Sequence, residues 1–231
     1  MSIILSIETG TEVCSVSLSN NSQIIDIRES AEPQAHARQL AVFIDEILKK
    51  NKLTTKDLSA VAVSEGPGSY TGLRIGVSTA KGICFGSGIP MIAIGSLEAL
   101  TQGAINQVGG NTDFLFCPMI DARRMEVYTA LYHGDGSAKT PVEALIIDEN
   151  SFKDDLDAST VYFFGNGAAK CAEVINHPNA KFIEVAHTAA NMVPLAHHLF
   201  DSGKFVDVAY FEPFYLKDFV VTKSKKNSLG L

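Results

Sequence analysis

The sequence lacks the marks of a membrane or secreted protein. No apolar run approaches the ~20 residues that span a bilayer, and the first residues, MSIILSIETG, contain neither a basic region nor a small-residue cleavage site. There is no CxxC pair, and the four cysteines are far apart in the chain: Cys14, Cys84, Cys117 and Cys171. We therefore expect a cytoplasmic protein with no membrane contact, whose cysteines are buried free thiols in a reducing compartment.

Positive charge is also scarce. The chain has 19 Lys and Arg residues against 26 Asp and Glu residues, which gives a formal net charge of −7. Its one basic cluster, Lys223, Lys225 and Lys226, is near the C-terminus, where a solvated tail is the simplest interpretation. An acidic protein binds a phosphate backbone poorly by itself, so we expect any contact with nucleic acid to be made through another subunit.

What is present is enough hydrophobic sequence for one large domain or two smaller ones, with 231 residues of which 46% are hydrophobic. Hydrophobic spacing and turn residues predict three strands, a helix, a strand, a helix and a strand in the first part of the chain. These elements are expected at Ile3–Glu8, Val13–Leu18, Gln23–Arg28, Pro33–Lys50, Ala60–Ser64, Tyr70–Ser87 and Pro90–Ile94. A further helix is expected to begin at Ser96.

The second half of the chain repeats this order. Its strands and helices are expected at Phe114–Ile120, Glu126–Tyr132, Val142–Ile147, Ser151–Leu156, Val161–Phe164, Ala168–Ile175 and Val193–Asp201. In each half an acid ends the first strand, Glu8 or Asp121, and a glycine-containing turn precedes a helix. We interpret this pattern as an internal duplication of a βββαβα unit, which gives an α/β fold with lobes at 1–102 and 103–231.

The helix predicted at Tyr70–Ser87 carries small residues on one face. Gly72, Gly76 and Ala80 recur at every fourth position, so they lie above one another. A glycine inside a helix costs about 1 kcal/mol relative to alanine, and close approach by another backbone is the usual reason for that cost. The approaching backbone is either the protein's own sheet or a helix of another subunit. Ser69 or Thr71 can cap the helix after the Gly66–Ser69 turn.

Four strings, in this order, resemble one protein family: ILSIETGTEVCSVSL, SEGPGSYTGLRIGVSTAKG, IDARRMEVY and EPFYLKDFV. A duplicated βββαβα unit with an acid after each first strand resembles the ribonuclease H-like lobes of the actin/hexokinase/Hsp70 (ASKHA) superfamily. Within it, the strings are similar to the TsaB (YeaZ) family over almost the whole chain, with the weakest stretch at 134–190. The family usually has Asp where this chain has Glu8, and the longer side chain keeps the charge.

The resemblance implies a role without catalysis. TsaB is a subunit of the bacterial complex that makes threonylcarbamoyladenosine (t6A) in tRNA. This chain is therefore expected to bind the catalytic paralogue TsaD, to reach the ATPase TsaE and tRNA through it, and to form a homodimer through the same face when alone. That face is expected on the helices at 33–50 and 70–87, with contacts from His36, Arg38, Leu40, Phe43, Ile44, Ile47, Gly72, Leu73, Arg74, Gly76, Val77, Ala80 and Lys81.

Core packing inside one lobe is the rival explanation for each apolar member of that set. If these residues instead contact a partner, a large side chain at Gly76 should block that contact. We expect Gly76→Leu to abolish partner binding while leaving the fold largely intact, because the added volume would block the approach of a partner helix.

In this superfamily the two hairpin turns hold nucleotide phosphates, while acids position a metal ion. The first turn here contains Glu8, Thr9, Gly10 and Thr11, but the neighbouring Glu12 disfavours a phosphate unless a cation lies between them. The second turn follows Asp121 and has no glycine. Its residue Arg123 either attracts phosphate or pairs with an acid across the lobes, and we favour the pairing. We expect a degenerate cleft with no cofactor beyond weak or interface-dependent ATP or ADP binding.

The resemblance also indicates where a metal site has been lost. The catalytic paralogue binds metal through His-x-x-x-His on the helix after the fifth strand, and Ser96 and Leu100 stand at those places here, with Glu98 between them. No catalytic constellation surrounds Ser69, which we expect to be a helix cap. Two alternative functions stay open at this point: an autonomous ASKHA-type ATP-dependent kinase or ATPase, and a glycopeptidase-like protease.

Overall fold

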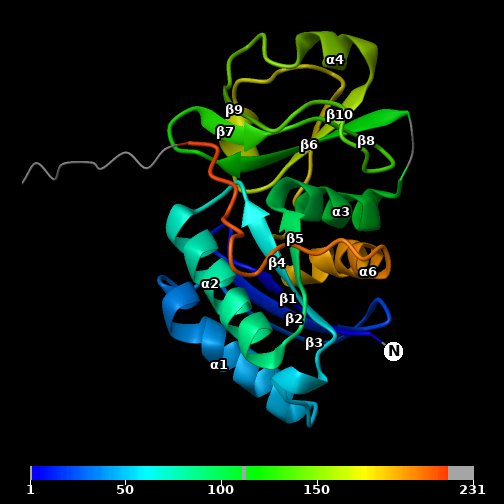
Figure 1. The fold of residues 1–231 in the computed structure, drawn as a ribbon. Helices are drawn as coiled ribbons and strands as arrows, with labels where there is room; N and C mark the ends of the chain where they lie inside the picture. The colour runs from blue at the N-terminus through cyan, green and yellow to red at the C-terminus, as the bar shows by residue number, and fades with distance from the viewer. Residues whose placement is uncertain (1, 111–112, 218–231) are drawn as a thin grey trace, which may run out of the picture.

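Two mixed sheets with the same strand order form the frame of the protein in a computed structural model, which describes residues 2–110 and 113–217. The first sheet has the order β3-β2-β1-β4-β5, and the main path of the second is β11-β10-β6-β7-β9. Taken in the reverse direction, the second order is β9-β7-β6-β10-β11, so β6 takes the central place that β1 has in the first sheet and the other strands correspond in the same sequence. The duplicated, ASKHA-like α/β fold is confirmed, with one lobe stacked on the other (Figure 1).

The first sheet consists of β1 Ile3–Glu8, β2 Cys14–Asn20, β3 Gln23–Ser30, β4 Ala60–Gly66 and β5 Met91–Gly95. Its helices are α1 Ala35–Lys50, η1 Thr55–Asp57 and α2 Tyr70–Ser87. Successive side chains of a strand point to opposite faces, and β1 shows why both faces must be covered. Leu5 and Ile7 pack with α1 and α2, whereas Ile4 packs on the opposite face with helices from later in the chain.

The second sheet consists of β6 Phe114–Asp121, β7 Glu126–Thr129, β8 Tyr132–His133, β9 Glu143–Ile146, β10 Thr160–Phe164 and β11 Ala180–Phe182. Its helices are α4 Lys153–Ala158 and α5 Ala168–Cys171. The strand expected at Glu126–Tyr132 is interrupted, because the Leu131 N–H donates to the Thr140 hydroxyl at 2.8 Å and not to a ladder partner. The helix expected at Ala168–Ile175 ends at Cys171.

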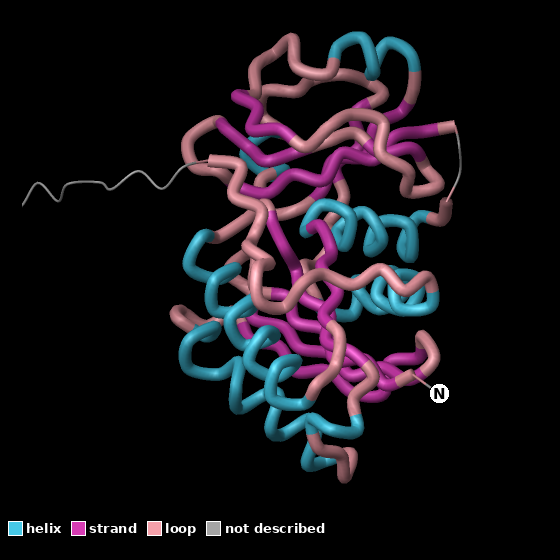
Figure 2. Tube along the Cα trace, viewed as in Figure 1, coloured by secondary structure: helices cyan, strands magenta, loops and turns pink. Residues whose placement is uncertain are grey.

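Helix α3, Ser96–Val108, lies between the two sheets (Figure 1). Its Leu97 and Leu100 are buried with Phe116 of the second sheet, and its Ala99 is buried with Ile92 of the first. The expected lobe boundary at 102 therefore falls inside a helix that both lobes share. Figure 2 shows the strands at the centre of each lobe, with helices on the outside and between them.

The C-terminal part of the chain returns to the first lobe. The short helix η2, Ala189–Met192, and α6, Val193–Asp201, cover the face of the first sheet opposite α1 and α2. Residues 202–217 then run back toward α2, where the Lys81 ammonium donates to the carbonyls of Ala209 and Phe211 at 3.0 Å each. The basic cluster near the C-terminus lies outside the described residues.

The cysteine expectation is confirmed, since all four cysteines are buried free thiols. Among the described residues, no helix is both long and apolar enough to cross a membrane.

Candidate functional site

The first hairpin turn, between β1 and β2, is sealed inside the first lobe. Glu8, Thr9 and Thr11 are at most 5% exposed. The Gly10 carbonyl accepts a hydrogen bond from the Ser69 N–H at 2.7 Å, so the turn before α2 lies directly on the β1–β2 turn. The turn that was expected to form part of a degenerate phosphate cleft is therefore covered by the chain's own backbone.

Glu8 is turned back into its own loop. One carboxylate oxygen accepts the Gly10 N–H at 2.6 Å, and complete burial raises the pKa of this carboxyl group, a shift only partly opposed by hydrogen bonds from Gly10, Ser64 and Thr9. The carboxylate oxygens of Glu8 therefore accept hydrogen bonds from residues of its own lobe. In the described part of the chain, no group of three His, Cys, Asp or Glu side chains is placed to hold a metal ion.

The second hairpin turn, between β6 and β7, is open to solvent but filled by a lysine. Lys170 of α5 forms an ion pair with Asp121, and its ammonium also donates to the carbonyls of Arg124 and Glu126 at 2.7 Å each. Three oxygens thus surround one internal cation. The Arg123 side chain is exposed, and its backbone N–H donates to Asp121 at 3.0 Å. Of the residues expected here, Asp121 and Arg123 lie together, but the cation that pairs with the acid is Lys170.

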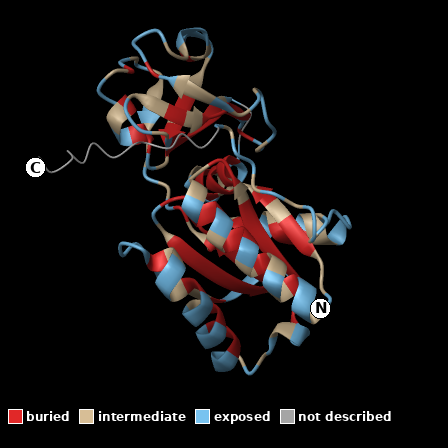
Figure 3. Ribbon diagram, turned by 60° about the vertical axis from the view of Figure 1, so that its left-hand side comes forward, coloured by how far each residue is buried: buried red, intermediate tan, exposed pale blue. Residues whose placement is uncertain are grey.

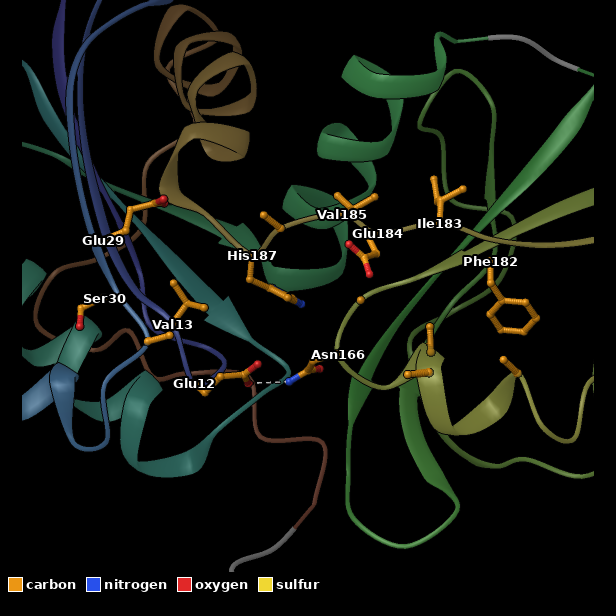
Figure 4. A pocket seen from close by; sticks show the side chains of 16 residues that line it. Glu12, Val13, Glu29, Ser30, Asn166, Phe182, Ile183, Glu184, Val185 and His187 are labelled. Atoms are coloured by element: carbon orange, nitrogen blue, oxygen red, sulfur yellow. Dashed lines mark hydrogen bonds between the residues drawn. The ribbon is translucent and has the colours of Figure 1, made fainter.

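Between the two turns lies a cavity of about 910 Å³, whose mostly apolar lining includes three glutamates. Glu12, Glu29 and Glu184 line it, together with His187, and Figure 4 shows these side chains from both lobes. The Asn166 amide donates to Glu12 at 2.7 Å across the mouth. Burial lowers the pKa of His187 to about 4, so its ring is neutral at neutral pH.

The negative charges on this cavity lining disfavour anionic ligands. No lysine or arginine of the described residues lines the cavity, so three glutamates face it without a positive partner inside. A nucleotide triphosphate would meet repulsion here unless metal ions accompanied it. The described lining of this cavity therefore contains no lysine or arginine side chain that could hold a phosphate group.

Helix α2 presses its small residues against the first turn. Side chains built on Gly72 or Gly76 would overlap the carbonyl oxygen or the hydroxyl of Thr9, respectively. The protein's own turn is thus the close backbone that these glycines accommodate. The Ser69 hydroxyl accepts the Gly72 N–H at 3.2 Å, which confirms the predicted cap.

Comparisons with known proteins give a consistent result. Residues 29–225 match the model of a family described as TsaD, tRNA N6-adenosine threonylcarbamoyltransferase. The tRNA threonylcarbamoyladenosine biosynthesis protein TsaB of Escherichia coli K12 is 30% identical over 230 residues, which cover 95% of this chain and 96% of the relative. The chain belongs to the TsaB family.

Solved structures agree with this TsaB assignment. A Pseudomonas aeruginosa protein described as uncharacterized, with similarity to peptidase YEAZ, superposes with a TM-score of 0.83 at 26% identity, over 94% of this chain and all of that one. A candidate N-acetylmannosamine kinase from Listeria monocytogenes has a TM-score of 0.52 at 11% identity, over 87% of this chain and 99% of that one, and this likeness shows the shared fold alone.

The structure of this TsaB-family protein corrects most of the expected partner contacts. The following residues are buried within the first lobe and are not available on its surface: Leu40, Ile44, Ile47, Gly72, Leu73, Gly76, Val77 and Ala80. Core packing, the rival explanation, holds for the apolar members of this set. Gly76→Leu would therefore strain the lobe against Thr9, so it is not a clean test of docking.

The other expected contacts divide into two groups. Arg38 and Arg74 are exposed on the outer side of α1 and α2, whereas His36, Phe43 and Lys81 are partly buried. The Lys81 ammonium is already bonded to the 202–217 segment. Ser78, Gly82 and Phe85 also face outward on α2, and none of them was among the expected contacts. Their signal was present as a second stripe at helical spacing, on the face opposite Gly72 and Gly76.

The residues at the positions considered for metal binding and peptidase chemistry are buried or cap a helix in this structure. Ser96 and Leu100, which stand where the paralogue is expected to have histidines, are at most 1% exposed inside α3. Ser69 acts as a helix cap, and no hydrogen bond joins its hydroxyl to a histidine among the described residues. His197 is buried between Ser2 and Ser19, at 3.2 and 2.9 Å, while His198 is exposed, so this adjacent pair does not form a chelate.

Proposed function

We propose that this TsaB-family protein is a non-catalytic subunit of t6A biosynthesis and acts by binding a catalytic paralogue of the TsaD type. The observation that carries the proposal is that both hairpin turns are occupied by the chain itself. Thr9 lies under the glycines of α2, and Lys170 fills the turn after Asp121. The name of the Escherichia coli relative supports the pathway.

In this proposal the paralogue performs the chemistry. It transfers threonylcarbamoyl from its adenylate to N6 of adenosine 37 in tRNAs that read codons beginning with A, and the ATPase TsaE joins the pair. This chain contacts tRNA only through the assembly, which is consistent with its net charge of −7. When alone, it forms a homodimer through the surface that otherwise receives the paralogue.

The proposed docking surface is the outer face of α1 and α2. In Figure 3 the two long helices of the first lobe carry exposed residues outward and buried residues toward the sheet. Phe85 is 87% exposed and Val42 is 49% exposed. Side chains built on Gly82 or Gly86 would meet nothing within 4 Å. A large exposed apolar side chain beside open glycines suits the close packing of a partner helix.

The test is to co-purify the full chain with the TsaD paralogue from the same cell and to measure the mass of the complex by size-exclusion chromatography with light scattering. We expect a stable heterodimer. Phe85→Ser and Gly82→Glu should each weaken it at least about tenfold, because burying an unpaired charge or losing an anchor costs more than 1.4 kcal/mol. Both changes lie at open positions, so the fold should be retained.

Ile146→Ser is the matched control. Ile146 is 70% exposed, like Phe85, but lies on β9 of the second lobe, so its loss should leave the complex intact. Absence of a complex, combined with ATP hydrolysis by this chain alone, would overturn the proposal in favour of an autonomous ATPase. Loss of binding by Ile146→Ser together with retention by Phe85→Ser would refute the proposed surface.

A further inference from the structure

The cavity between the two hairpin turns carries three exposed glutamates that no cation of the described chain neutralises. Glu12 and Glu29 belong to the first lobe, and Glu184 follows β11 of the second. None of them forms an ion pair within residues 2–110 and 113–217. The groups that bond Glu12 and Glu29, the Asn166 amide and the Ser15 hydroxyl at 2.7 Å each, are neutral donors. The negative charge on this lining is therefore available to a ligand.

A buried imidazole in the same cavity is an independent sign of a ligand. His187 is 8% exposed, and its ring points into the space between the lobes (Figure 4). Its Nε2 atom is buried and has no hydrogen-bond partner among the described residues. A buried polar atom that stays unpaired destabilises the folded protein. A ligand in the cavity that forms a hydrogen bond with Nε2 would remove this cost.

The imidazole and the acids together indicate what such a ligand offers. The ring of His187 is neutral, and a neutral imidazole has one donor and one acceptor nitrogen. With its proton on Nδ1, the ring presents Nε2 as an acceptor for an N–H group. Glu12 is the charged side chain that acts on this ring. One ammonium group could therefore donate to His187 while its positive charge is balanced by Glu12.

The remaining walls favour an alkyl chain. Val13 of the first lobe, and Ile183 and Val185 on either side of Glu184, line the cavity together with several alanines. Apolar methylene groups gain free energy when they leave water for such walls. The volume of about 910 Å³ is in the range of small-molecule sites. In the described chain no three His, Cys, Asp or Glu side chains are grouped to hold a metal ion, so an organic cation fits better than a bare one.

The acids of the two lobes require more than one positive charge. An ammonium group beside Glu12 would leave Glu184, on the second-lobe side, without a positive partner (Figure 4). We propose that this cavity binds an alkyl diammonium compound, with one ammonium group between Glu12 and His187 and the other beside Glu184. Its alkyl chain lies against the apolar walls. This binding goes beyond the scaffold role and does not depend on it.

The experiment is a calorimetric titration of the full chain with 1,4-diaminobutane. The comparison compounds are n-butylammonium, which has the same carbon chain and one charge, and Mg²⁺, which has two charges and no carbon chain. We expect saturable binding of one diammonium molecule, at least about tenfold tighter than n-butylammonium. Absence of binding, equal binding of n-butylammonium, or tighter binding of Mg²⁺ at the same site would overturn the assignment.

Two variants test the first ammonium position. Glu12→Gln keeps an acceptor for Asn166 but removes the charge, and it should weaken binding of 1,4-diaminobutane at least about fivefold. Glu149→Gln is the matched control, because Glu149 is exposed and does not line the cavity. Its titration should be unchanged. An equal loss in both variants would mean attraction to the net charge of the protein and would refute a defined site.

His187→Phe separates a ligand-binding imidazole from a structural one. The variant keeps an aromatic ring and removes the unpaired Nε2, so binding should weaken about fivefold while the melting temperature of the free protein stays the same or rises. A purely structural His187 predicts the reverse, a lower melting temperature with an unchanged titration, and that result would overturn its role as an acceptor. Glu12→Gln, at an exposed position, keeps the site testable if His187→Phe does not fold.

Discussion

The two hairpin turns occupy equivalent places in the two lobes and are closed in different ways. The first turn is closed by packing, since Thr9 lies under Gly72 and Gly76 of α2 and the turn is shielded from solvent. The second is closed by charge, since Lys170 reaches Asp121 and two backbone carbonyls at a partly exposed site. The two equivalent turns are thus occupied through two different kinds of interaction, which should respond to different perturbations.

The largest expected effect separates the two faces of α2. Gly72→Ala should lower the free energy of unfolding by about 3 kcal/mol, because the added methyl group would overlap the backbone of Thr9. Gly82→Ala, on the open face of the same helix, should raise it by about 0.5–1 kcal/mol through helix propensity. Urea denaturation of the two variants measures the difference. Equal effects would show that the first turn is not closed by packing.

A medium effect is expected at the second turn. Lys170→Met should destabilise the protein by about 1–2 kcal/mol, because the methionine keeps the apolar stem but leaves Asp121 and two carbonyls without their donor. The loss should shrink in 1 M NaCl, since the pair is partly exposed to solvent. Lys204→Met, at an exposed lysine, is the control. A loss that salt leaves unchanged would contradict closure by charge.

The smallest effect is expected from the acid of the first turn. Burial raises the pKa of Glu8 above its ordinary 4.5, so the folded protein keeps this proton to a higher pH than the unfolded chain does. The free energy of unfolding therefore falls as the pH rises from about 4.5 to the raised pKa. Glu8→Gln keeps an acceptor for Gly10 and carries no charge, so its stability relative to wild type should increase with pH over that window.

Thermal unfolding between pH 4 and pH 8 measures this relative gain. Glu149→Gln, at an exposed glutamate, should show no such trend and controls for the loss of one negative charge. A constant difference between Glu8→Gln and wild type across the range would mean that the buried carboxyl group does not titrate differently in the folded and unfolded protein.

The duplicated architecture could be predicted because its signals are local. Alternating apolar residues, the glycine turns and the Ser69 cap each act within a few residues, and the structure confirms the repeated order of elements along the chain that they suggested. The interruption of the strand after Thr129 could not be predicted in this way. It depends on a hydrogen bond from Leu131 to Thr140, nine residues further along the chain.

The sequence could not show whether the small-residue face of α2 points into its own lobe or outward to a partner. The spacing of Gly72, Gly76 and Ala80 shows that something approaches closely, but the same spacing serves an internal turn and an external helix equally well. The role of Lys170 was missed for a related reason. It lies 49 residues from Asp121, and only the packing of α5 against β6 brings the two side chains together.

The return of η2 and α6 to the first lobe has a consequence for synthesis on the ribosome. One face of the first sheet, including Ile92, stays partly uncovered until Met192 and Ala196 have been made about a hundred residues later. At typical bacterial elongation rates this interval lasts about 5–20 s. The nascent chain therefore exposes an apolar sheet face for seconds, during which a holding chaperone or a neighbouring nascent chain can bind it.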